Sequence, residues 1–239
     1  MATRNGSTRR DELLATAGRM FAEQGLRSTT VRDIADSAGI LSGSLYHHFD
    51  SKESMVDEIL RSFLDSLFAR YQEIAAADLS ATETLRELVV ASFESIGAQR
   101  HAVAIYQDEA KRLAGQERFA YIKKRNVEFR ELWHSVLARG VADGEFRADL
   151  DIELAYRFLR DTVWVAVRWY RPAARCRSTT SPSSTCPSCS TGYCRAESFW
   201  LDPSGRHSSC RFASTYLDDL VIWVSFGGDE GVRGGYRQR

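Results

Sequence analysis

The chain has 239 residues, of which 44% are hydrophobic and 27% charged, and its formal net charge at pH 7 is zero. This composition is ordinary for a globular protein with one small and one medium domain, and the zero charge gives no argument for nucleic acid binding. It excludes a membrane-spanning protein, because no apolar run approaches the roughly 18–20 residues that cross a bilayer, and the polar N-terminus lacks a signal-peptide core. We expect a cytoplasmic protein without a membrane partner.

The first two predicted helices lie in residues 8–38. Apolar residues recur at helical spacing over residues 8–24, and Gly25 ends this helix. Thr29 or Thr30 can cap a second, short helix, and Thr30 with Asp33 resembles a capping box.

A glycine turn and two further helices follow. Gly39 supplies the turn, and Ser42 can cap a third short helix. Asp50 or Ser51 can cap a long fourth helix. The pattern of short helix, glycine turn and second short helix is typical of a helix-turn-helix, whose second helix lies in the DNA major groove.

Only helical patterns follow, so we predict an all-α fold. The expected helices span about 82–98, 100–114, 117–143 and 151–170. Gly140 and Gly144 mark a turn region, and Asp149 or Asp151 can cap the last helix. Residues 163–167 are almost wholly apolar, which indicates that this helix is buried.

Candidate DNA-binding residues gather around the second and third helices. Small residues at 42–44 let the backbone approach DNA, and the polar tips of Tyr46 and His47 suit phosphate oxygens. Lys52 adds its charge to the positive end of the following helix. The candidates for DNA binding are Thr29, Thr30, Arg32, Ser42, Gly43, Ser44, Tyr46, His47 and Lys52.

Plainer roles remain open for several of these residues. Tyr46 could pack in the interior, and Arg32 could be an ordinary surface arginine. His47 and His48 are adjacent and cannot share a helix face, so we expect His47 to point outward and His48 to pack or cap. A metal site at this pair is not expected.

The stretch from 10 to 56 resembles the TetR family of regulators. The resemblance implies an all-helical homodimeric repressor that binds double-stranded operator DNA, with its recognition helix at 42–49. It also implies a DNA-binding domain at 8–56 and a ligand-binding and dimerisation domain at 57–172. The residues that carry it are Gly25, Thr29, Thr30, Ile34, Ala35, Gly39, Ser44, Leu45, Tyr46, His48, Phe49 and Lys52.

Within this family, the chain is similar over residues 8–172 to the repressors of sterol catabolism in actinobacteria. The similar segments are GILSGSLYHHFDSKESMVDEIL, YQDEAKRLAGQERFAYI and YRFLRDTVWVAVRWYRP. This similarity implies that the regulated genes degrade the late C/D-ring remnant of cholesterol. The inducer it implies is an acyl-CoA-type sterol metabolite, a CoA thioester. No cofactor is expected.

Candidate ligand-binding residues lie on the last predicted helix. Arg160 and Trp164 are four residues apart, and Arg168 continues the same face. An arginine there either meets an anionic or carbonyl group of the ligand, with Trp164 stacking on its apolar body, or pairs internally with Asp161 or Glu109.

The sequence changes character near Pro172. All five cysteines lie between Cys176 and Cys210, and all four prolines lie at or after Pro172. The single CxxC, Cys186 to Cys189, lacks the second pair of a zinc ribbon, so no metal site is expected. We expect residues 173–239 to be an aberrant tail, largely irregular and poorly ordered.

A frameshift would explain this tail. GC-rich codons can be chosen for residues 172–197 that, read from the last base of the Pro172 codon, encode GGPLPVDDLAEQYLPIVLDGLLPGG. The family resemblance implies that the chain should end with one more amphipathic helix. The alternative reading frame encodes such a helix.

Four other functional readings remain. An enzyme is not expected, because no catalytic triad, phosphate loop or metal set is recognisable. The chain could be a TetR-type regulator of another small hydrophobic ligand, or a DNA-binding protein without a ligand. It could also be a nonfunctional product whose altered C-terminus prevents dimerisation.

Overall fold

The computed structural model describes residues 3–168, and every regular element in this range is helical. The predicted all-α fold is thereby confirmed for this part of the chain. The α-helices are α1 (Thr3–Gln24), α2 (Val31–Ser37), α3 (Ser42–Tyr46), α4 (Lys52–Ala76), α5 (Ala81–Ala98), α6 (Arg100–Leu113), α7 (Tyr121–Ala142) and α8 (Ile152–Val165). Two short 3₁₀ helices are η1 (Glu117–Phe119) and η2 (Ala166–Arg168).

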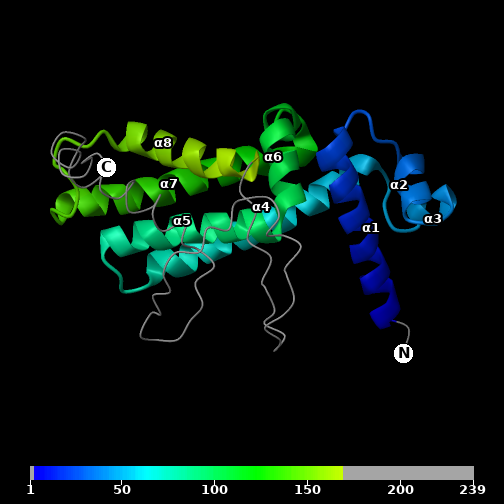
Figure 1. Ribbon diagram of the computed structural model, residues 1–239, viewed down its shortest axis with the longest axis horizontal. Coiled ribbons are helices and arrows are strands. Elements are labelled where there is room, and N and C mark those ends of the chain that lie inside the picture. Colours follow the sequence, from blue (N-terminus) through cyan, green and yellow to red (C-terminus); the bar gives the residue numbers. More distant parts are fainter. Residues whose placement is uncertain (1–2, 169–239) are drawn as a thin grey trace, which may run out of the picture.

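The helices form two groups joined by α4. Helices α1, α2 and α3 lie at one end of the molecule, with α3 farthest from α8 (Figure 1). From that end α4 runs into a bundle in which it packs with α5, α6 and α7, and α8 lies on α7 (Figure 1). Met55 and Tyr71, near opposite ends of α4, are both buried in the continuous apolar core. None of the helices within residues 3–168 is long and apolar enough to cross a bilayer.

Most of the predicted helix caps are confirmed. Thr30 and Asp33 form the expected capping box at the start of α2, and Ser51 caps α4. Asp151 caps α8, so Asp149 does not. The expectation for Ser42 was wrong: it is the first residue of α3, and Leu41 occupies the cap position without a side-chain hydrogen bond to the helix.

The turn after α7 begins later than we expected from its glycines. Gly140 lies inside α7 and is buried, and only Gly144 has the positive φ, +74°, of a turn glycine. A Cβ atom at Gly140 would lie 2.2 Å from the ring of Phe146, so glycine lets the turn fold back onto the helix. Beside Phe146, the Glu145 carboxylate accepts from the backbone N–H groups of Ala81 and Thr82 at 2.9 Å, which caps α5.

The last predicted helix is shorter than its apolar pattern indicated. Instead of continuing to residue 170, α8 ends at Val165 and tightens into η2. The predictions for the tail, residues 173–239, lie outside the described residues.

Candidate DNA-binding surface and ligand cavity

The α2–turn–α3 unit is held by a small apolar core. Ile34 of α2 and Leu45 of α3 are fully buried, and Gly39 makes the turn between the helices with φ +67°. Phe49 follows α3 and is buried under the guanidinium of Arg10, which lies 4.1 Å from the ring centroid. Arg10 also pairs with Glu58 and donates to the carbonyl of His48, so α1 joins α4 to the end of α3.

The outer face of α3 carries most of the predicted DNA-binding residues. Gly43, Ser44, Tyr46 and His47 are exposed, and Ser42 is half-buried. His48 is half-buried, so the two histidines divide between outside and inside as we expected. An exposed Tyr46 is not the internal packing residue of the alternative reading.

Thr30 and Arg32 stand beside this face. The hydroxyl of Thr30 donates to the Asp33 carboxylate at 2.7 Å, and this bond, with one from the Thr30 backbone, lowers the pKa of Asp33. The Arg32 side chain is 84% exposed and lies 3.9 Å from Asp36, so its guanidinium is accessible from solvent.

Thr29 and Lys52 make internal contacts that the sequence did not predict. The Thr29 side chain is fully buried and donates to the carbonyl of Gly25 at 2.9 Å. The Lys52 ammonium donates to the carbonyls of Leu26 at 2.8 Å and Thr29 at 3.0 Å. Both residues therefore fix the turn between α1 and α2, and two of the three N–H groups of Lys52 are engaged within the chain.

A cavity of about 760 Å³ opens between α6, α7 and α8. Its lining residues are Tyr71, Tyr106, Gln107, Ala110, Lys111, Asn126, Val127, Phe129, Arg130, Trp133, Glu153, Tyr156, Arg157, Arg160, Asp161, Val163, Trp164 and Val165. The volume is in the range of small-molecule sites.

Aromatic rings form much of the cavity wall. Tyr71 packs edge-on against Trp133, with ring centroids 5.8 Å apart, and its hydroxyl bonds the buried Ser92 at 2.5 Å. Trp164 packs edge-on against Phe63 at 6.0 Å. Burial raises the pKa of Tyr71 and raises that of Tyr106 to about 12, so both phenols are neutral near pH 7. The aromatic part of the wall is therefore uncharged.

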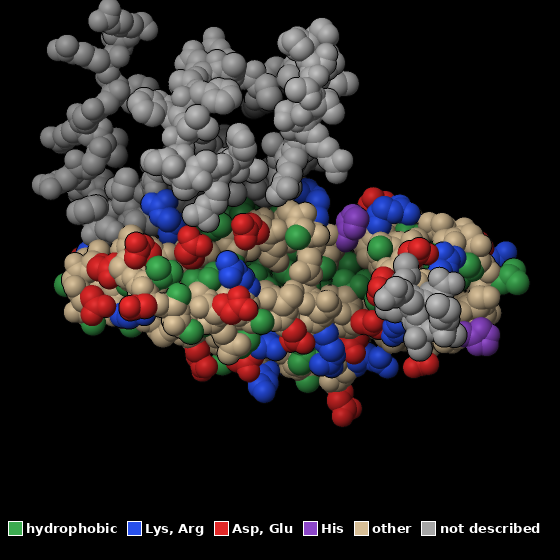
Figure 2. Space-filling view, turned by 90° about the horizontal axis from the view of Figure 1, so that it is seen from below, with side chains coloured by type: hydrophobic (Ala, Val, Ile, Leu, Met, Phe, Trp, Pro, Cys, Tyr) green, Lys and Arg blue, Asp and Glu red, His purple; other side chains and the backbone are tan. Residues whose placement is uncertain are grey.

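A charged cluster borders the wall. The Glu153 carboxylate accepts from Arg130 at 2.7 Å and from Arg157 at 2.8 Å, and these bonds lower its pKa to about 2. His134 Nε2 lies 3.1 Å from the same carboxylate. Elsewhere, acidic and basic side chains are interspersed over the face of the helical body drawn in Figure 2, in keeping with the zero net charge.

Two of the three predicted ligand residues line this cavity. Trp164 is half-buried in its wall. The Arg160 guanidinium pairs at 2.8 Å with Asp161, one of the two partners that the plainer reading named, but the two side chains are 45% and 70% exposed, so the pair is not internal. Arg168 was wrongly expected on the same face: the chain tightens into η2 at Ala166, and Arg168 is exposed and outside the lining.

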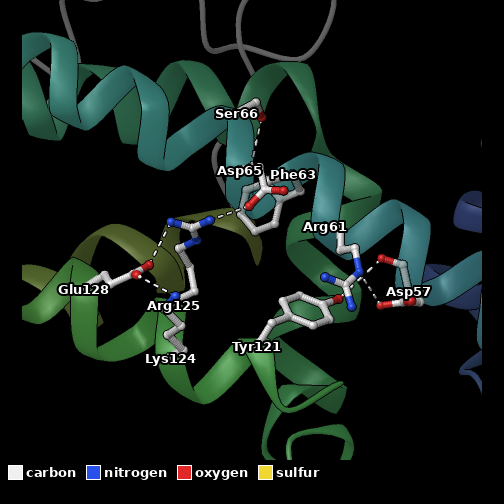
Figure 3. Close-up of polar contacts among 9 residues, drawn as sticks. All are labelled: Asp57, Arg61, Phe63, Asp65, Ser66, Tyr121, Lys124, Arg125 and Glu128. Carbon is white, nitrogen blue, oxygen red and sulfur yellow. Dashed lines mark hydrogen bonds and ion pairs between the residues drawn. The ribbon is translucent and has the colours of Figure 1, made fainter. Parts of the chain in front are cut away.

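Polar contacts between α4 and α7 were not predicted from the sequence. Arg125 of α7 donates to Asp65 of α4 at 2.5 Å and to Glu128 at 2.8 Å (Figure 3). Arg61 of α4 lies 3.9 Å from the ring centroid of Tyr121 and pairs with Asp57 (Figure 3).

These contacts join the helix that lines the cavity to the helix that begins beside α2 and α3. Residues 126, 127 and 130 of α7 line the cavity immediately after Arg125, and α4 begins next to α2 and α3. A second connection runs through α1, which lies against α6 and α4: a Cβ atom at Gly18 would lie 3.5 Å from Ile59 and 3.9 Å from His101.

Comparison with family models divides the chain in the same way. Residues 13–59 match a model described as bacterial regulatory proteins of the tetR family. Residues 78–178 match a model described as a tetracyclin repressor-like C-terminal domain.

Similar proteins cover most of the chain before the tail. The HTH-type transcriptional repressor KstR2 of Rhodococcus jostii is 66% identical over 170 residues, 71% of this chain and 83% of that protein. KstR2 of Mycobacterium tuberculosis is 61% identical over 166 residues, 70% of this chain and 83% of that protein. The solved structure of the ketosteroid transcriptional regulator KstR2 of Mycobacterium tuberculosis has a TM-score of 0.75 at 48% identity, covering 91% of this chain and 95% of that one.

Proposed function

Since the chain belongs to the TetR family of bacterial regulatory proteins, whose members are DNA-binding regulators and not enzymes, we propose that it is a ligand-responsive repressor of sterol-degradation genes. It binds palindromic operator DNA as a homodimer and is released by a CoA thioester of a sterol metabolite. The sterol assignment is supported by the names of its relatives, KstR2 and ketosteroid transcriptional regulator.

The outer face of α3 supports DNA binding. A recognition helix needs small side chains where it enters the major groove and polar groups at its edges for phosphates. Gly43 and Ser44 supply the first, and Tyr46 and His47 the second. With Ser42, Thr30 and Arg32 they form the proposed DNA surface, from which we leave out the internal Thr29 and Lys52.

Exposed apolar side chains on α8 support the homodimer. Leu154 and Phe158 are large, exposed apolar residues, and their four-residue spacing places them on one side of the helix. Exposed apolar surface of this kind is typical of an interaction site. Two copies joined here would present two α3 helices, which a palindromic operator requires.

The cavity is the observation that carries the ligand proposal. Its aromatic wall suits an apolar ring system, and the cationic groups at its border suit a polar, anionic tail. An acyl-CoA has both parts. Arg160 and Lys111 are the cavity-lining cations that Glu153 does not bind.

Release from DNA requires that the ligand bind the DNA-incompetent conformation more tightly. An operator gel shift with and without a steroid-derived CoA thioester tests the whole proposal. We expect the unliganded chain to retard operator DNA and the thioester to release it. A thioester that leaves the complex intact, at concentrations where calorimetry shows saturation, would contradict the repressor mechanism and favour a ligand-independent DNA-binding protein.

Variants assign the response to the cavity. Arg160→Ala and Trp164→Ala should retain operator binding and lose release by the thioester. Arg168→Ala is the matched control, since Arg168 is on the same segment and outside the cavity lining. Wild-type thioester affinity in both cavity variants would place the ligand elsewhere. Release by a different small hydrophobic molecule alone would favour the second candidate, a TetR-type regulator of another ligand.

A further inference from the structure

Leu41, the residue before α3, has a large apolar side chain that is 80% exposed. Tyr46, the next most exposed large hydrophobic residue among those described, has a polar hydroxyl at its tip, whereas Leu41 offers only carbon. Leaving such a side chain in water gives the folded chain no burial energy. Its position at the DNA-facing end of the molecule therefore needs an explanation.

The local backbone does not require leucine at this position. Leu41 has the extended conformation of a helix cap, φ −72° and ψ 141°, which polar residues adopt equally well. Its carbonyl accepts from the N–H of Ser44 at 2.9 Å, a bond that any side chain would allow. Four other helices use Thr30, Ser51, Ser80 and Asp151 as capping side chains.

Gln99 and Ala120 also leave their helices without a side-chain cap, so the missing cap does not by itself indicate a function. Leu41 differs from both because it lacks a side-chain cap and also exposes a bulky apolar side chain to solvent. Its neighbours leave that group unobstructed: Ser42 and Ser44 are small, and a Cβ atom at Gly43 would meet nothing within 4 Å.

We propose that Leu41 is a specificity-determining residue that packs against the C5-methyl group of a thymine in the major groove. This inference rests on the proposed function. The first residues of a recognition helix meet base edges, and the thymine methyl is the apolar group that the major groove presents. A side chain without donors or acceptors can distinguish bases there only through this methyl group.

Replacement of thymine by uracil tests the contact, because uracil lacks only the C5-methyl group. The full chain first selects its preferred duplex from a random library, and each thymine of that duplex is then replaced in turn. We expect one position in each half-site to weaken binding about fourfold per methyl group, the effect of burying one such group. Leu41→Ser should bind the thymine and uracil duplexes alike.

Two controls keep the outcome clear. Tyr46→Phe should weaken binding to both duplexes and keep their ratio, because a phosphate contact does not depend on the methyl group. Thermal unfolding of Leu41→Ser should show a melting temperature at least equal to that of the parent chain, since serine restores a cap. If Leu41→Ser does not fold, Leu41→Ala replaces it.

The inference and the proposed function fail in different ways. If no uracil position weakens binding, or if Leu41→Ser discriminates as the parent chain does, Leu41 does not read a methyl group, while DNA binding itself stands. If the chain selects no duplex from the library, the repressor proposal fails and the role of Leu41 fails with it.

Discussion

The ammonium of Lys52, the first residue of α4, donates a hydrogen bond of 3.0 Å to the carbonyl oxygen of Thr29, just before α2. The bond ties the start of the long helix to the turn that positions the helix-turn-helix. We therefore expect Lys52→Met to destabilise the fold by about 1–3 kcal/mol, because two backbone carbonyls lose their partner. Urea unfolding measures this.

The same variant separates an internal from a phosphate-binding lysine. The slope of log affinity against log salt should change little in Lys52→Met, while Arg32→Ala, which removes an exposed guanidinium, should reduce it by about one. If Lys52→Met reduces the slope by one and leaves the stability unchanged, Lys52 contacts a phosphate, as the sequence first indicated.

Arg125 and Asp65 should transmit part of the ligand response, because their ion pair joins the cavity-lining helix α7 to α4. In Arg125→Met we expect the thioester to bind with nearly parental affinity and to release operator DNA less effectively. The coupling factor is the ratio of thioester affinities with and without operator. Arg70→Met, which breaks the exposed Arg70–Glu73 pair within α4, is the matched control. Equal coupling in both variants would rule out this route.

Glu153 should make stability depend on acid pH. Its pKa is about 2 in the folded chain, below the ordinary glutamate value of 4.5, so its contribution is present above pH 4.5 and declines as the pH falls towards 2. Arg130, Arg157 and His134 face the carboxylate. Between pH 5 and pH 3 we expect the Glu153→Gln variant to lose less unfolding free energy than the parent chain. Parallel acid profiles for the two proteins would contradict this.

Gly140→Ala should destabilise the bundle although alanine ordinarily favours a helix. The added Cβ atom would overlap the buried ring of Phe146, and overpacking of this kind costs about 1–3 kcal/mol. Gly43→Ala is the control, since its Cβ atom meets nothing within 4 Å. Thermal unfolding compares the two. A Gly140→Ala variant as stable as the parent would mean that Phe146 moves without cost.

The tail after Pro172 should weaken the dimer. The family resemblance implies that the dimer bundle takes two apolar helices from each chain, and residues 173–239 as written hold few apolar residues before Leu217–Val224. We expect a variant with the alternative-frame tail to dimerise more tightly and to aggregate less. Sedimentation at matched concentration compares them. Equal dimerisation, or genomic DNA without an open alternative frame, would remove the frameshift hypothesis.

Local signals in the sequence were sufficient for most helix starts. Thr30, Ser51 and Asp151 cap helices through bonds within three residues, so their roles could be predicted from spacing. The role of Lys52 could not, because its acceptors lie 23 and 26 residues away. Arg125 and Asp65 are 60 residues apart, and only the packing of α4 on α7 brings them together. Arg168 was misplaced because a helical period was extended past the point where α8 ends.

Helix α4 spans 25 residues without a break, and its buried side chains run along the continuous apolar core. Met55 and Val56 lie near its start, at the end of the molecule formed by α1, α2 and α3, and Tyr71 and Ile74 lie near its end, within the bundle. Neither group of helices can melt without exposing apolar surface on an element that the other needs. Heat or denaturant should therefore unfold residues 3–168 in a single cooperative transition, and a fragment cut inside α4 would lose the core residues that hold it folded.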